Sequence, residues 1–298
     1  MSDRKTEKPS KGRTFLNRAF SSVWAWAIVV VAITLNKPWF YLAMFIAMTV
    51  VGLAEFFRLV PDKGFRRFQW QTFVITIGYA VLLFGGVWGW NSAWADRADG
   101  LAIAALFLLI AIDRIRSGLE GYRTIDEIAI SIFGFVYIVI LFGFVPKILN
   151  LPLVSEAGEN SARFYVVFLL VVTKFTDMGA YLVGSMIGRH KMIPKISPGK
   201  TWQGFGGAIF FALLGSYGCY FLFSQHIPLI SSLHAGILGV LLALIAVLGD
   251  LVESILKRSF EAKDSGHMMP GIGGVLDLID SILLTAPVFF VYLLFLLG

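Results

Sequence analysis

Nine long apolar runs, separated by mostly short polar segments, constrain this 298-residue chain more than any other feature. A helix needs about 20 residues to cross the hydrocarbon core of a bilayer, and most of the runs are long enough. Backbone groups in lipid must be hydrogen-bonded within their own segment, so the runs are expected to be helices. The runs are Phe20–Leu35, Trp39–Phe57, Thr72–Trp90, Leu101–Ile112, Ile125–Val145, Phe164–Ile187, Phe205–Phe223, Leu233–Val252 and Gly274–Leu297. The sequence therefore predicts an all-α, polytopic helical bundle in the lipid bilayer.

Composition excludes an ordinary water-soluble domain. Hydrophobic residues make up 57% of the chain and charged residues 15%, against roughly 45–50% and about 25% in soluble domains. The net charge of +6 could indicate a nucleic-acid-binding protein, but most of the excess lies in short segments beside apolar runs. Such charge suits anionic lipid headgroups, so no nucleic-acid partner is expected. Cys219 is the single cysteine, which excludes an intrachain disulfide and a cysteine metal cluster.

The placement of lysine and arginine predicts the orientation. With nine spans, 20 of the 25 basic residues fall on the side of a basic N-terminal arm, residues 1–18. Four fall on the other side, and Lys174 lies inside a span. Because positive residues concentrate in cytoplasmic loops, the arm is expected in the cytoplasm and the C-terminus outside. The run Leu101–Ile112 has only twelve residues, so eight spans is the alternative count.

Residues 19–298 are predicted to form a single membrane domain, with the chemistry concentrated at about 173–280. Inside the sixth run, Lys174 and Asp177 are three positions apart and share a helix face. Ionisable residues in membrane helices usually mark functional sites. An internal ion pair that only fixes packing is the alternative. Gly184 and Gly188 follow at the four-residue spacing that lets helices approach closely, so we expect them to serve packing.

A basic segment, Gly188–Gly204, falls on the predicted cytoplasmic side. The hydroxyls of Ser197 and Thr201 and the cations of Lys195 and Lys200 could surround phosphate oxygens. The segment is not a Walker A loop, because the G-x-x-x-x-G-K-[ST] frame is absent. A basic loop that only follows the positive-inside rule is the alternative.

Charge and glycine are concentrated in the stretch Ser254–Asp280, between the last two apolar runs. If the eighth helix continues into this stretch, one of its faces carries a polar stripe of Asp250, Glu253, Ser254 and Lys257. Charge beside lipid is costly to keep, so a function is expected there.

Three aspartates of this region are predicted to hold a divalent cation. Asp277 and Asp280 share a face at the start of the last helix, and Asp250 lies on the helix before it. Mg²⁺ takes oxygen ligands, commonly one or two carboxylates together with substrate phosphates. Three basic residues could neutralise a triphosphate or a leaving pyrophosphate: Lys257, Arg258 and Lys263. Helix capping by Asp277 and ordinary solvation of the lysines are the alternatives.

These residues resemble the signature of the phosphatidate cytidylyltransferases, or CDP-diacylglycerol synthases. That signature reads S-x-hydrophobic-K-R, four residues, K-D-x-small, then P-x-H-G-G-hydrophobic-x-D-R-hydrophobic-D. The matching residues are Ser254, Lys257, Arg258, Lys263, Asp264, Gly266, Pro270, Gly273, Gly274, Asp277 and Asp280. The segments Asp177–Gly188, Ile196–Gly204 and Gly249–Leu251 are also similar to the family. The resemblance covers about Thr173–Asp280 specifically, and the helices before it by hydropathy alone.

The sequence departs from the signature at two positions that carry polar chemistry. Ile272 stands where the family has a histidine before the double glycine, and Leu278 stands where it has an arginine after the first aspartate. A hydrogen-bonding imidazole and a cation are therefore missing. The carboxylates are intact, so metal binding is expected to survive while nucleotide or lipid contacts differ.

The resemblance implies an enzyme that transfers a cytidylyl group from CTP to phosphatidic acid, releases pyrophosphate and requires Mg²⁺. By this resemblance the catalytic residues are Asp250, Lys257, Asp277 and Asp280, and the aspartates among them hold the metal. The remaining substrate contacts are expected at Asp177, Ser197, Lys200, Ser254, Arg258, Lys263, Asp264, Gly273 and Gly274.

The resemblance also implies a homodimer, the inner membrane of a bacterium and an active site on the cytoplasmic side. Three other classes use part of the same residues: a CTP-dependent lipid-alcohol kinase, a membrane transporter and a scaffold without activity. The sequence alone leaves them open.

Overall fold

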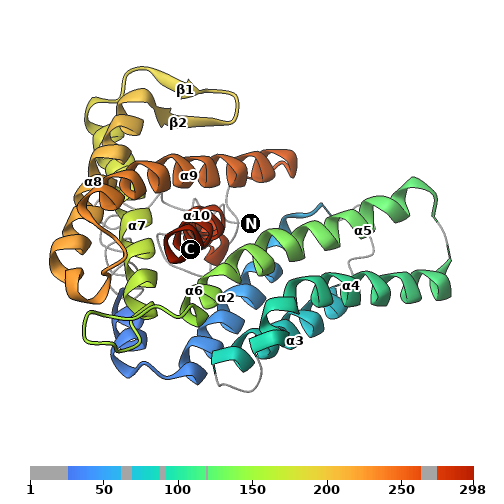
Figure 1. Cartoon of the computed structure of the whole chain (residues 1–298). Helices are drawn as coiled ribbons and strands as arrows, with labels where there is room; N and C mark the ends of the chain where they lie inside the picture. The colour runs from blue at the N-terminus through green and yellow to red at the C-terminus, as the bar shows by residue number, and fades with distance from the viewer. Residues whose placement is uncertain (1–25, 62–68, 88–91, 119, 263–273) are drawn as a thin grey trace, which may run out of the picture.

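The fold was analysed in a computed structural model, which describes residues 26–61, 69–87, 92–118, 120–262 and 274–298. The described chain is almost entirely helical (Figure 1). An unlabelled helix, Trp26–Leu35, comes first. The longer labelled helices are α2 (Pro38–Leu59), α3 (Gln69–Val87), α4 (Ser92–Ser117), α5 (Tyr122–Gly134), α7 (Ala162–Ile187), α8 (Trp202–Phe223), α9 (Ser232–Ser259) and α10 (Val275–Leu297). The shorter elements are the π-helix η1 (Phe135–Ile140), α6 (Phe144–Asn150) and the 3-10 helix η2 (Ser224–His226).

Six helical segments in the described ranges are long and apolar enough to cross a membrane. One of them, Tyr122–Asn150, joins α5, η1 and α6. The chain is thus an integral membrane protein built from helices, as predicted, but the count of nine spans is not confirmed. The doubtful run Leu101–Ile112 lies within the 26-residue helix α4 and is extended at both ends. Its ends are charged, which is why its apolar length looked short in the sequence.

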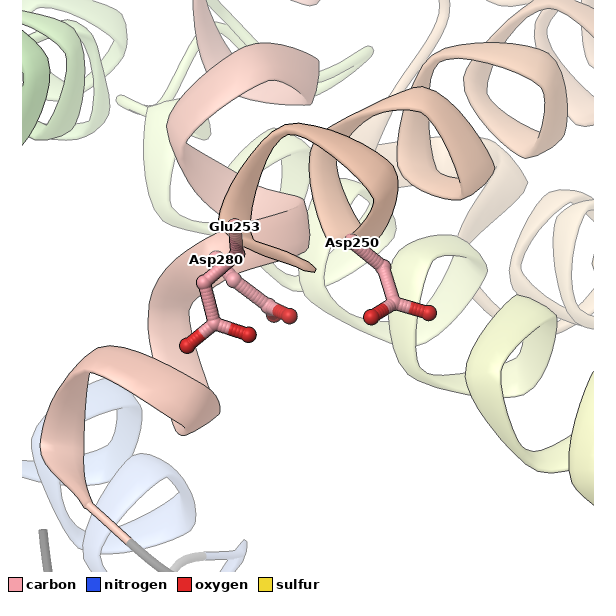
Figure 2. Close-up of side chains that lie close together, drawn as sticks. All are labelled: Asp250, Glu253 and Asp280. Carbon is pink, nitrogen blue, oxygen red and sulfur yellow. The ribbon is translucent and has the colours of Figure 1, made fainter. Parts of the chain in front are cut away.

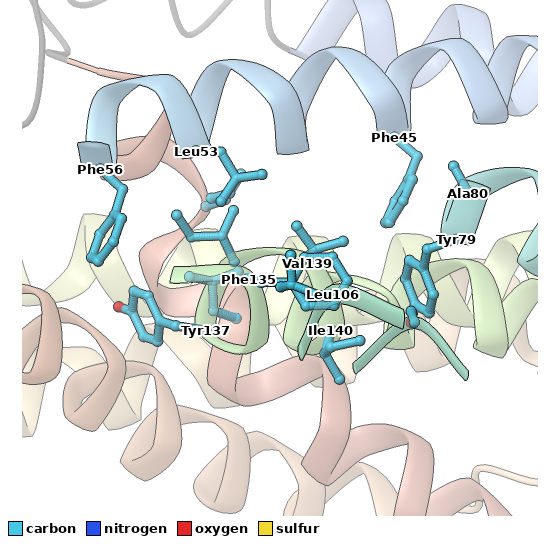
Figure 3. Packing of buried hydrophobic residues seen from close by; sticks show 14 of the residues in the cluster. Phe45, Leu53, Phe56, Tyr79, Ala80, Leu106, Phe135, Tyr137, Val139 and Ile140 are labelled. Carbon is cyan, nitrogen blue, oxygen red and sulfur yellow. The ribbon is translucent and has the colours of Figure 1, made fainter. Parts of the chain in front are cut away.

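The buried side chains form two hydrophobic cores that share helix α10. The first core lies among α2, α3, α4 and η1, and Figure 3 shows part of its packing. Leu276, Ile279 and Leu283 bring the first half of α10 into it. The second core lies among α6, α7, α8 and α9, and its contacts with α10 are Ile282, Ala286, Phe289 and Leu293. A helix that is apolar on most sides is stable when protein surrounds it, and Figure 1 shows α10 end-on at the centre of the bundle.

Glycines allow α7 and α8 to pack closely. A Cβ added at Gly179 would lie 2.5 Å from the carbonyl oxygen of Gly207, and one at Gly184 would lie 3.5 Å from the Cα of Gly204. Small residues at such contacts let membrane helices approach until their backbones touch. The predicted packing role of Gly184 is confirmed. Gly188 is more crowded still, because a Cβ there would lie 2.7 Å from Thr201 Oγ1.

Replacing Gly207 with alanine is expected to destabilise the fold. The new Cβ would lie 2.5 Å from Val183 Cβ and 2.7 Å from the carbonyl oxygen of Gly179, so the helices must separate, at a cost of about 1–3 kcal/mol. Gly206→Ala is the matched control, because a Cβ at Gly206 meets nothing within 4 Å. Thermal unfolding of the purified protein in detergent should show a lower midpoint for Gly207→Ala alone, and equal midpoints would contradict this packing.

The segment Gly188–Gly204, expected to be a loop, contains a small antiparallel sheet. Strand β1 (Lys191–Ile193) pairs with β2 (Ser197–Thr201), with Lys191 opposite Thr201 and Ile193 opposite Ser197. The hairpin projects from the bundle beside the start of α8 (Figure 1). Thr201 caps that helix, because its hydroxyl accepts a hydrogen bond from the backbone N–H of Gly204 at 3.1 Å.

Candidate active site

Three carboxylates from two helices form the centre of the candidate site. Asp250 and Glu253 lie one turn apart on α9, and Asp280 lies on α10. One oxygen of each is within 4.8 Å of the others, and Figure 2 shows the three side chains converging. Gly249 makes this possible, because α10 passes so close that a Cβ there would lie 2.9 Å from the carbonyl oxygen of Asp280. The crossing of two helices therefore creates a cluster that neither helix has alone.

The burial of this cluster favours a bound cation. Glu253 is 2% exposed and Asp280 is 6% exposed, whereas the side chain of Asp250 is 44% exposed and opens the cluster to the outside. Two buried like charges at this separation repel by about 3 kcal/mol at an effective dielectric constant of ~20. Hard divalent cations take carboxylate oxygens as ligands. The donor set therefore fits Mg²⁺, with room at Asp250 for further oxygen ligands.

Lysines from two segments neutralise part of this charge. Lys257, one turn after Glu253 on α9, lies 2.7 Å from the Glu253 carboxylate and also pairs with Asp277. Lys200 comes from β2 and lies 2.9 Å from Asp250 Oδ2. Its ammonium group also donates to the carbonyl oxygen of Val247 at 2.9 Å. The structure thus brings the basic segment and the acidic helices together, as a site for phosphates requires.

The contacts of Asp277 differ from those of Asp250 and Asp280, the other two predicted metal ligands. Its carboxylate pairs with Lys257 and accepts a hydrogen bond from the backbone N–H of Gly274 at 2.6 Å. Gly274 precedes the first residue of α10, so Asp277 caps the helix from its third position. Glu253, not Asp277, completes the carboxylate cluster with Asp250 and Asp280. Asp277 nevertheless adjoins the cluster, because Lys257 pairs with both Asp277 and Glu253 and these two carboxyl groups also interact directly.

Helix α7 contributes an ion pair that reaches the same region. Lys174 Nζ lies 3.1 Å from Asp177 Oδ2 and donates to the carbonyl oxygen of Leu278 at 2.8 Å. The Ser281 hydroxyl lies 3.1 Å from Asp177 Oδ1 and 3.2 Å from Asp280 Oδ1, so it bridges the two aspartates. The two interpretations of Lys174 and Asp177 are therefore compatible: they form an internal ion pair, and it borders the carboxylate cluster.

The other predicted site residues lie around this centre or outside the described ranges. The Arg258 Nε donates to the carbonyl oxygen of Ile196 at 3.5 Å, which connects α9 to the hairpin. Ser254 is half-buried on α9 and Ser197 is half-buried on β2. Lys263, Asp264, Gly273 and the replaced position Ile272 lie outside the described residues.

Sequence reasoning missed a buried acid of the site region on α2. Glu55 is 1% exposed, and its Oε2 accepts a hydrogen bond from the backbone N–H of Leu276 at 2.8 Å. It therefore caps the start of α10 from another helix, and a side chain at Gly274 would collide with it. A lone acid inside the apolar run Trp39–Phe57 was the available signal. Glu253 was recognised in the polar stripe but not assigned to the metal.

The chain is similar to known proteins over most of its length. The model described as the cytidylyltransferase family matches residues 16–296. The uncharacterized protein YnbB of Escherichia coli (strain K12) is 29% identical over 270 residues, which are 90% of this chain and 84% of YnbB. A phosphatidate cytidylyltransferase of Bacillus subtilis (strain 168) is 36% identical over 200 residues, or 66% of this chain and 70% of that protein. One of Mycobacterium bovis is 28% identical over 272 residues, or 87% and 82% respectively.

Proposed function

Because the chain belongs to the cytidylyltransferase family, we propose that it transfers the cytidylyl group of CTP to phosphatidic acid, giving CDP-diacylglycerol and pyrophosphate. Relatives named phosphatidate cytidylyltransferase support this substrate pair. The observation that carries the proposal is the cluster of Asp250, Glu253 and Asp280 between Lys200 and Lys257. A cation site flanked by lysines is what a membrane enzyme needs to hold a nucleoside triphosphate against a lipid phosphate.

The proposed reaction needs alignment and charge neutralisation more than a strong base. An oxygen of the phosphatidic acid phosphate attacks the α-phosphorus of CTP, the new P–O bond forms, and the bond to the bridging oxygen of the β-phosphate breaks. The electron pair of that bond leaves on pyrophosphate. The attacking phosphate is already an anion, so no proton has to be removed from it, and holding the two phosphates in line supplies much of the acceleration.

The lysines have defined roles in this proposal. Lys200 and Lys257 are paired with carboxylates in the protein described here, and phosphate oxygens compete for the same ammonium groups when substrate binds. Their positive charge is then available to the leaving pyrophosphate. Asp177 and Ser197 border the site, and Arg258 extends the basic surface toward the hairpin.

Mg²⁺ is part of the proposal. The ligands would be Asp250, Glu253 and Asp280, which replaces Asp277 of the sequence-based set with Glu253. Asp277 instead holds Lys257 and the start of α10 in position. When bound, the cation would polarise phosphoryl oxygens as a Lewis acid.

The proposal places the site on the cytoplasmic side of a bacterial inner membrane, with a cytoplasmic N-terminus. The excess of lysine and arginine on that side supports this orientation, and CTP is a cytoplasmic metabolite. The relatives named above come from bacteria. A homodimer is part of the same proposal and rests on family resemblance.

A transfer assay tests this function directly. Purified protein in mixed micelles, given α-labelled CTP, phosphatidic acid and Mg²⁺, should convert the label into a lipid-soluble product and release pyrophosphate. Chelation of Mg²⁺ should stop the reaction. In a parallel sample with γ-labelled CTP and a polyprenol, no label should enter the lipid. Transfer of the γ-phosphate to the polyprenol would instead identify a lipid-alcohol kinase.

A further inference from the structure

Tyr137 combines a buried position with a hydroxyl that has no hydrogen-bond partner among the described residues. It lies on η1 and is 4% exposed. Other buried tyrosines are satisfied: the Tyr79 hydroxyl donates to Asp99 Oδ1 at 2.9 Å, and Tyr165 accepts from the backbone N–H of Leu229 at 3.3 Å. A buried polar group without a partner is costly, and buried tyrosines usually have one. The buried Tyr137 hydroxyl, which has no hydrogen-bond partner among the described residues, is therefore unusual and suggests a ligand.

Tyr137 lies in the part of the first core that borders α9 and α10. Its ring stacks on Phe133, with centroids 5.6 Å apart and planes 9° apart, and Figure 3 shows it at the edge of the first core. The neighbouring residue Ile138 packs where α2 meets α10, because a Cβ at Gly52 would contact both Ile138 and Ile279. Ile279 of α10 belongs to the same core and Val252 of α9 packs against it, so Tyr137 shares this core with the sequence neighbours of Asp280 and Glu253. The negative charges of the cluster also act on the hydroxyl.

The backbone that carries Tyr137 departs from a regular α-helix. η1 is a π-helical turn inside the continuous span Tyr122–Asn150. Such a turn adds a residue to the helix and changes the direction of the side chains that follow, and π-turns in α-helices occur frequently at functional sites. Tyr137 is the polar residue of this otherwise apolar turn, Phe135–Ile140. The turn thus brings one buried hydroxyl from the first half of the chain into the core that α9 and α10 border.

We infer that the Tyr137 hydroxyl is a substrate-binding group, which donates a hydrogen bond to a phosphoryl oxygen held at the cluster of Asp250, Glu253 and Asp280. The inference rests on the proposed function and adds a residue to its site. A carboxylate cluster that binds a cation also attracts the phosphate oxygens that share that cation. The Tyr137 hydroxyl would then have the hydrogen-bond acceptor that the described residues do not supply. The negative charge on a phosphoryl oxygen strengthens such a bond. Lys200 and Lys257 pair with the cluster from β2 and α9, whereas Tyr137 belongs to a third element, η1.

Tyr137→Phe tests this inference, because it removes the hydroxyl and keeps the ring and its stacking on Phe133. The kinetics are measured with full-length protein in mixed micelles, varying CTP with phosphatidic acid saturating and then the reverse. We expect a rise in KM of about 10-fold or more for the substrate whose phosphate receives the bond, since bonds to charged groups are the strong ones. A rise for CTP identifies the nucleotide phosphate, and a rise for phosphatidic acid identifies the lipid phosphate. The midpoint of thermal unfolding without substrate should not fall, because no bond within the described protein is lost.

Tyr79→Phe is the matched control. Its hydroxyl is equally buried but bonded to Asp99, so this variant should lower the unfolding midpoint and leave both KM values unchanged. If Tyr137→Phe has wild-type kinetics with both substrates, the inference is wrong while the proposed function stands. If Tyr137→Phe loses activity only in step with a lower unfolding midpoint, the hydroxyl is structural and the inference is also wrong. A wild-type protein that transfers nothing from CTP overturns the proposed function itself.

Discussion

Asp280→Asn is expected to lower the rate of CTP-dependent transfer by roughly 10²–10³-fold, the effect of removing one group that stabilises charge in a transition state. Asp280 is buried at the contact of α9 with α10, and its Oδ1 accepts hydrogen bonds from the backbone and hydroxyl of Ser281. Asparagine preserves the volume of the side chain and removes the charge. The measurement is transfer of label from α-labelled CTP to phosphatidic acid at saturating Mg²⁺.

The unfolding midpoint gives a second readout for Asp280→Asn. A cation that binds only the folded protein raises the midpoint, so Mg²⁺ should stabilise the wild type and have a smaller effect on the variant. Without Mg²⁺ the variant should be at least as stable, because one of the clustered negative charges is gone. Asp99→Asn, which alters an acid paired with Lys147 and Tyr79, should keep both transfer and the response to Mg²⁺.

Asp277→Asn distinguishes the two metal-ligand sets. If Glu253 is the third ligand, Asp277→Asn should disturb Lys257 and the start of α10 but keep the concentration of Mg²⁺ that gives half-maximal rate. Glu253→Gln should raise that concentration by about 10-fold or more. The reverse outcome would restore the sequence-based set with Asp277.

Lys174→Ala is expected to lower transfer by about 100-fold, comparable with the loss of a buried, hydrogen-bonded charge pair. Lys174 lies 3.1 Å from Asp177 and donates to the backbone of Leu278, the position at which the related signature has an arginine. A cation from α7 thus contacts the backbone of this position on α10. We expect Lys174 to supply the positive charge that the replacement by leucine removed.

A double variant tests whether Lys174 takes the role of the arginine that the signature has at position 278. The double variant Lys174→Ala/Leu278→Arg carries an arginine where the family signature has one. Its rate of transfer should be at least 10-fold higher than that of Lys174→Ala. Leu278→Arg alone places two cations together and should not increase the rate. If the double variant is no more active than Lys174→Ala, while both unfold at similar temperatures, Lys174 does not fill the role of the missing arginine.

Much of the site was predictable because carboxylates between apolar runs are costly to keep. Asp250 and Asp280 stood out for this reason, and the structure places them in one cluster. Asp277 was selected with them because it shares a helix face with Asp280. A residue at the third position of a helix is also well placed to cap it, and Asp277 does cap α10. The hairpin was not predictable, because its strands of three and five residues show no clear alternation and one contains Pro198 and Gly199.

The sequence by itself determined that the chain is a membrane protein built from helices, because lipid leaves the backbone of long apolar runs no other way to satisfy its hydrogen bonds. It also indicated the polar segments that carry the chemistry. Only the tertiary structure decided which side chains meet: the close crossing at Gly249, the reach of Lys200 to Asp250, and the packing of Tyr137 in one core with α10. These contacts depend on how helices far apart in the sequence cross, and spacing along one helix carries no information about that.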